Sequence, residues 1–184
     1  MKFQFYLLFI SIFFIRCDQV KNVDISNYKQ FVNKSILTED DIKIFVARLE
    51  AAENVQKVEK YFNENGVQGR FVITTADGEI VKLEEQNGYE NGNESNRFYF
   101  TQGQLIYANY SQLSKESDGK KPSISELMVA FGDGKILSAK SKSMSFDKPN
   151  QIADMGAMQS KTVSLNYSVE LKKAADKLEK SKKL

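Results

Sequence analysis

Three short segments of this chain share one pattern, in which two β-forming runs flank a glycine. The segments are centred on Gly78, Gly103 and Gly134. In each segment the glycine is the second residue of a two-residue link, as in Asp77-Gly78. Such links require positive φ values, which glycine adopts without steric penalty, and Asp-Gly is a strong signal for a β-hairpin. The pattern therefore predicts three consecutive hairpins of one antiparallel sheet.

The side chains that meet across these hairpins predict one strongly apolar face of the sheet. A two-residue turn places Phe100 opposite Leu105 and Phe98 opposite Tyr107. An apolar face has to be covered by another element. Residues 38–65 show apolar residues at three- and four-residue steps, which is typical of a helix with one buried stripe. This helix is the expected cover.

The expected fold class is α+β, with a six-stranded antiparallel meander of three hairpins over residues 70–146. The N-terminal helix covers one face of the meander, with Thr38 as its candidate N-cap. Residues 150–184 are expected to form a C-terminal helical region, although residues 163–169 also fit a strand by their alternation. Residues 38–184 are therefore expected to form a single domain.

The N-terminus predicts export from the cytosol. Residues 3–15 form an unbroken apolar run behind one cation, Lys2. A helix of this length spans only about 20 Å, which is too short for the hydrocarbon core of a bilayer. A short apolar run behind a single positive charge is typical of a secretory signal peptide. The alternative is a buried N-terminal helix or strand, but a folded helix normally interrupts its apolar run with polar residues.

The apolar run ends near Cys17, the only cysteine of the chain. This arrangement resembles the N-terminus of bacterial lipoproteins, in which a lipid is attached to a cysteine that becomes the first residue after cleavage. The resemblance covers residues 1–17 and implies a signal peptide at 1–16, a lipid on Cys17 and a tether over 17–37. Arg16 stands where the family has a small residue. The implied partner is the membrane, and the implied location is the cell envelope, at the outer membrane or the cell surface.

The hairpin region carries a second, looser resemblance. Residues 70–145 are similar to uncharacterised bacterial envelope proteins whose strands follow the pattern aromatic-x-Phe-x-x-Gly-x-Leu-Ile. The resemblance implies a sheet of this type and an envelope location, and it implies no activity. The residues that match the pattern are Phe98, Phe100, Gly103, Leu105 and Ile106.

Composition and charge exclude several classes of function. The chain has 26 lysines and arginines against 24 acids, and Lys2 and Arg16 supply the whole excess, so that the chain from Cys17 onward is formally neutral. Binding to nucleic acid requires a basic excess, so no nucleic-acid partner is expected. Histidine is absent, which removes imidazole metal sites and histidine-dependent catalysis. Adjacent carboxylates such as Glu84 and Glu85 diverge, and no catalytic residue, metal ion or cofactor is expected.

The remaining expectation is a binding or interaction protein without enzymatic activity, with an envelope or host protein as its partner. Side chains that could line a binding surface on the open face of the sheet, or simply pack within it, are Tyr99, Ile106, Tyr107 and Tyr110. One alternative is a structural or assembly module that pairs with another chain through an edge strand. A further alternative is an enzyme that acts through carboxylates alone.

Overall fold

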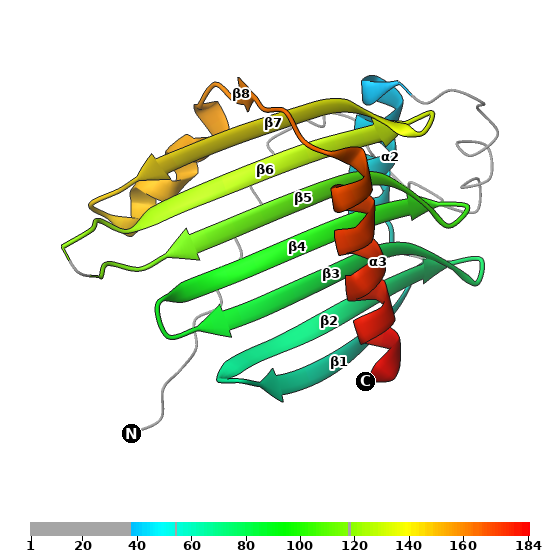
Figure 1. The fold of residues 1–184 in the computed structure, drawn as a ribbon, viewed down its shortest axis with the longest axis horizontal. Coiled ribbons are helices and arrows are strands. Elements are labelled where there is room, and N and C mark those ends of the chain that lie inside the picture. Colours follow the sequence, from blue (N-terminus) through cyan, green and yellow to red (C-terminus); the bar gives the residue numbers. More distant parts are fainter. Residues whose placement is uncertain (1–37, 54, 118) are drawn as a thin grey trace.

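The computed structural model describes residues 38–53, 55–117 and 119–184. Eight antiparallel strands follow one another in sequence order through a single sheet. One helix crosses each side of the sheet, and α3 lies in front of the strands in Figure 1 while α2 lies behind them. In chain order the elements are α2 (Glu39–Glu50), β1 (Gln56–Glu64), β2 (Val67–Ala76), β3 (Glu79–Tyr89), β4 (Gly92–Thr101), β5 (Gln104–Ser114), β6 (Ser123–Gly132), β7 (Lys135–Ser145), η2 (Pro149–Ala157), β8 (Lys161–Thr162) and α3 (Tyr167–Lys183).

The predicted α+β meander with an N-terminal and a C-terminal helix is confirmed, but the sheet has eight strands rather than six. One additional strand, β1, occupies part of the region predicted as the second half of a long helix. α2 ends at Glu50, and a turn at Asn65 and Gly66 joins β1 to β2. Most of β1 is exposed on both sides. It therefore lacks the alternation of buried and exposed residues that identifies a strand in a sequence.

The other additional strand is the short β8, which pairs with the middle of β7. Lys161 lies opposite Ser141, and Thr162 lies opposite Lys140. The chain then passes to α3, whose N-cap is Asn166. The strand alternative for residues 163–169 therefore does not hold, because helix begins at Tyr167 and β8 has already ended. In the described ranges, no helix combines the length and the apolar character needed to cross a membrane.

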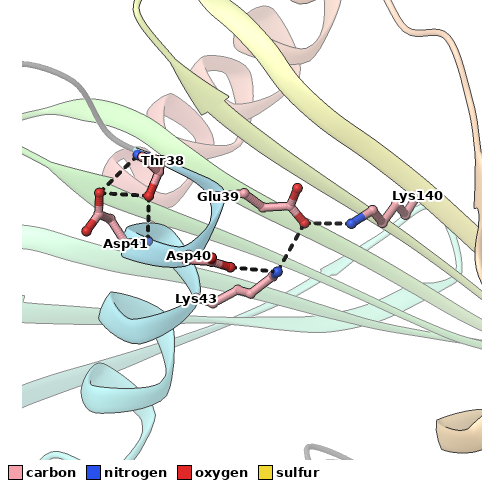
Figure 2. Close-up of polar contacts among 6 residues, drawn as sticks. All are labelled: Thr38, Glu39, Asp40, Asp41, Lys43 and Lys140. Carbon is pink, nitrogen blue, oxygen red and sulfur yellow. Dashed lines mark hydrogen bonds and ion pairs between the residues drawn. The ribbon is translucent and has the colours of Figure 1, made fainter.

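Thr38 caps α2 as predicted. Its hydroxyl accepts a hydrogen bond from the backbone N–H of Asp41, and the Asp41 carboxylate accepts one from the backbone N–H of Thr38 (Figure 2). The next residue, Glu39, contacts Lys43 one turn along the helix and accepts a hydrogen bond from Lys140 of β7 at 2.6 Å. These contacts tie the first turn of α2 to the β7 side of the sheet.

The three predicted turns are confirmed, and β1 and β2 are joined by a fourth of the same kind. The first central residues, Asn65, Asp77, Gln102 and Asp133, have φ values between 48° and 52°. Each is followed by a glycine with φ between 69° and 81°. Positive φ at both central residues is the type I′ geometry, whose twist matches that of the flanking strands.

A β-bulge in each of the three predicted hairpins changes the predicted pairing beyond the turn. Tyr107 lies opposite Tyr99 rather than Phe98, because Ile106 is the extra residue of the bulge. Ordinary alternation places Leu105 on the α3 side and Ile106 on the α2 side, and the bulge then keeps Tyr107 on the α2 side as well. The Leu-Ile step of the repeated pattern thus contributes to two cores.

Part of each side of the sheet is buried beneath a helix, whereas only the cover by the N-terminal helix was predicted. We call the two sides the α2 face and the α3 face. On the α2 face the buried cluster includes Phe45, Leu49, Val81, Tyr99 and Ile106. On the α3 face it includes Phe71, Leu83, Phe98, Val129, Phe131 and Ala174.

Candidate functional site

The strands extend well beyond α3. In Figure 1 the left-hand ends of β3, β4 and β5 lie to the left of this helix and are not covered by it. Because side chains alternate between the two faces, the strand register defines which residues share the α3 face there. The outermost row consists of Tyr89, Gly92, Ser114, Ser123 and Ser145. The next row consists of Asn87, Glu94, Gln112, Ser125 and Ser143. We call these two rows the polar array.

The polar array carries hydroxyl and amide groups and a single charged side chain, Glu94. The Glu94 carboxylate accepts hydrogen bonds from the Tyr89 hydroxyl, at 3.0 Å, and from the amide of Asn96. Burial, followed by this hydrogen bond and the Glu94 charge, raises the pKa of Tyr89 to about 12. The phenol therefore stays protonated at neutral pH and acts as a donor. The one charge of the array is already engaged by its neighbours.

The polar array is accessible to a ligand. Gln112, Ser143 and Ser145 are exposed, and Tyr89 is 41% exposed. The row of residues closer to α3 includes Tyr110 and Leu127, which are only partly buried. The array therefore forms a surface of low charge, and the row that borders it also includes Glu85 and Asn96.

The α2 face of the same strands is different, because it carries paired charges. Lys82 contacts Glu84 at 3.1 Å, and Arg97 lies 3.5 Å from the same carboxylate. Further along this face, Lys142 contacts Glu126 at 3.0 Å. These positive and negative side chains balance one another. The α2 face is therefore stabilised by ion pairs, of which the pair between Lys142 and Glu126 lies nearest to the polar array.

Glu84 allows the ion-pair network to be tested through its pH dependence. Burial opposes ionisation of Glu84, but the charges of Lys82 and Arg97 outweigh this effect and hold its pKa below the ordinary value of 4.5. Because the folded-state pKa is lowered, the stabilisation is fully present above pH 4.5 and is lost as the pH falls through the folded-state pKa. We expect Glu84→Gln to flatten the dependence of the unfolding free energy on pH below 4.5.

Urea unfolding at a series of pH values measures this slope. The exposed Glu90→Gln, on the turn between β3 and β4, is the matched control and should leave the slope unchanged. Equal flattening in both variants would show that the Glu84 network does not stabilise the fold.

Two buried carboxylates hold α3 against the sheet beside the polar array. Glu85, which is 1% exposed, accepts a hydrogen bond from Asn96 and contacts Lys177 of α3 at 2.7 Å. Glu170 of α3, which is 2% exposed, accepts a hydrogen bond from the Tyr110 hydroxyl at 2.7 Å and contacts a lysine of its own helix. Each carboxylate thus has a cation and a further donor. This is the arrangement of structural ion pairs, whereas a catalytic pair needs two carboxylates that flank one substrate bond.

The four side chains considered for a binding surface do not lie on one surface. Tyr99 and Ile106 are buried in the core beneath α2, and Tyr107 packs against that core. Tyr110 lies on the α3 face, where its hydroxyl binds Glu170. The first two are therefore packing residues. Cys17, the predicted lipid attachment site, lies outside the described residues.

The sequence alone does not indicate the polar array, because the strongly polar composition of residues 85–96 is typical of an exposed loop. The structure instead continues β3 to Tyr89 and begins β4 at Gly92. One signal was present in the sequence of β7, where serines alternate with larger side chains between residues 139 and 145. Alternation of this kind indicates a strand with one face of small hydroxyl side chains.

Comparison of the chain with protein-family models, with curated proteins and with solved structures finds no match. Within the part of the chain that the structure describes, there is no group of three or more cysteine or carboxylate side chains that could hold a metal ion.

Proposed function

We propose that this protein is an exported, lipid-anchored protein of the cell envelope that binds a ligand through the polar array and has no enzymatic activity. The observation that carries the proposal is the low charge of the polar array. Charged residues make up 27% of the chain, yet Glu94 is the only one in the accessible array. Solubility alone does not require such a surface, because exposed charges meet that requirement.

The N-terminus supports the proposed location. An apolar run followed by a solitary cysteine is suited to export and lipid attachment, with Cys17 as the attachment site. Each acyl methylene buried in the bilayer contributes about 0.8 kcal/mol, so several acyl chains on one cysteine anchor a protein firmly. Residues 17–37 would then serve as a tether between the anchor and the sheet.

Substitution of the cysteine tests the anchor. We expect the full chain, expressed in a bacterium that processes lipoproteins, to incorporate radiolabelled palmitate and to sediment with the membranes. Cys17→Ser should abolish the label and move most of the protein to the soluble fraction, because no thiol remains for acylation. Ser35→Ala, within the proposed tether, should change neither property. Label that persists in Cys17→Ser would remove the proposed anchor.

Assembly through an edge strand is a second candidate function, and β1 favours it. Within the described ranges β1 pairs only with β2, and its Val58 and Tyr61 side chains are exposed. The unpaired backbone groups of such an edge can extend a sheet into another chain. This function predicts oligomers of the full chain whose population rises with protein concentration. Ligand binding by the polar array does not require them.

A further inference from the structure

We propose that the ligand of the polar array is an uncharged carbohydrate. This inference rests on the proposed function and names the chemical class that the array would bind. It follows from the charge, the side-chain chemistry and the spacing of the array.

The charge of the array disfavours ionic ligands. Nucleic acids and acidic polymers need lysine or arginine side chains at the contact surface, and the array has none. Its one carboxylate, on Glu94, already accepts hydrogen bonds from Tyr89 and Asn96. A charged ligand would therefore lose water without gaining a counter-charge.

The side-chain chemistry disfavours a protein partner. The centres of protein interfaces are enriched in aromatic side chains, methionine and arginine, and they are depleted in serine. The central part of the array is instead Ser114, Ser123, Ser125 and Ser143 with Gln112. Serine hydroxyls and glutamine amides both donate and accept hydrogen bonds, as the hydroxyl groups of a sugar do.

The spacing of the array suits a repetitive ligand. Neighbouring strands are about 4.8 Å apart and alternate residues along a strand are about 7 Å apart. Donors and acceptors therefore recur at regular intervals across β5, β6 and β7. At the β3 end of the outer row lies Tyr89, which is 41% exposed and combines an aromatic ring with a polar tip. Such an amphipathic ring can pack against the C–H face of a sugar while its hydroxyl stays hydrogen-bonded.

Binding of defined oligosaccharides by the full chain, purified in detergent, tests the inference. The probes are a panel of neutral oligomers of glucose, mannose and N-acetylglucosamine, with an oligomer of galacturonic acid as the acidic comparison. We expect at least one neutral oligomer to bind at least tenfold more tightly than the acidic one. Failure of every neutral oligomer to bind, or tighter binding of the acidic one, would overturn the inference.

Two variants locate the binding surface. Gln112→Lys places a long charged side chain in the array and should weaken binding of the neutral oligomer at least tenfold. Gln104→Lys makes the same change at an exposed position of the same strand, beside the turn, and should leave binding unchanged. Thermal unfolding of both variants establishes that they are folded. Equal binding by the two variants would show that the array is not the site.

Treatment of isolated envelopes separates this inference from the proposed function. We expect the Cys17→Ser chain, which carries no lipid, to be retained by envelopes after protease digestion and to be lost after periodate oxidation, which destroys the vicinal hydroxyls of sugars. The reverse result would assign the array to a protein partner, which overturns the carbohydrate and leaves the binding function standing. Lack of retention by untreated envelopes would overturn the binding function itself.

Discussion

Lys177→Met is expected to destabilise the protein by about 3 kcal/mol, at the lower end of the range for breaking a buried ion pair. The substitution leaves Glu85, which is 1% exposed, without the only cation that contacts it in the described structure. The hydrogen bond from Asn96 alone does not compensate for the lost hydration of a carboxylate. The effect lies at the lower end because Lys177 itself is partly exposed.

Urea unfolding of four proteins measures the interaction: the native chain, Lys177→Met, Glu85→Gln and the double variant. We expect the double variant to be more stable than Lys177→Met alone, because it contains no buried unpaired charge. This coupling is the quantity that a double-mutant cycle isolates. Additive effects would show that Lys177 and Glu85 act independently and that this pair does not hold α3 on the sheet.

Gly92→Ala is expected to destabilise the protein by more than about 4 kcal/mol, a loss large enough to prevent folding. A Cβ atom at residue 92 would lie 2.1 Å from the carbonyl oxygen of Leu113 and 3.1 Å from its carbon. Both are backbone atoms of the paired strand β5, so no side-chain rotation relieves the clash. The first row of the polar array, in which Gly92 lies between Tyr89 and Ser114, would be disrupted.

Gly88→Ala is the matched control on the neighbouring strand. Its Cβ atom would meet the carbonyl oxygen of Gln68 at 3.5 Å, an ordinary van der Waals distance. We expect a change within about 1 kcal/mol of the native stability, because alanine also reduces the entropy of the unfolded chain. Far-UV circular dichroism and urea unfolding measure both variants. A folded Gly92→Ala of native stability would contradict the close approach of β4 to β5.

The contacts that hold α3 on the sheet are connected to the polar array. Glu85 and Asn96 occupy the row next to the array, and Asn96 also donates to Glu94 within it. The ion pair that holds α3 is thus connected to the array through one amide. Loss of the Lys177 contact is therefore expected to disturb the second row as well as the helix.

Much of the sheet was predictable because its turns are local. The positive φ values that a two-residue hairpin requires restrict the residues at Asp77, Gln102 and Asp133 and at the glycines that follow them. The N-cap at Thr38 was predictable for the same reason, since capping involves only the next three residues. Asn65-Gly66 carries the same signal, but the helical spacing of the preceding apolar residues obscured it.

The polar array was not predictable in this way, because it is made by five strands whose relative positions depend on the register of the whole sheet. The bulge at Ile106 moves Tyr107 opposite Tyr99, and this shift determines the alignment of every residue further along β5. Only then do Ser114, Ser123 and Ser145 lie side by side. The ion pair between Glu85 and Lys177 holds α3 over one part of the α3 face. The polar array, on the other part of this face, therefore stays open.

The chain's own residues are thus sufficient for its turns, its helix cap and the α+β class, because these depend on neighbours within a few positions. Three features became evident only in the tertiary structure: the exposure of β1, the cover of the α3 face by α3, and the polar array. They depend on contacts between residues such as Lys60 and Ser181, which are 121 positions apart in the sequence. Side-chain burial and pairing at that separation are set by packing of the entire sheet, which no local pattern specifies.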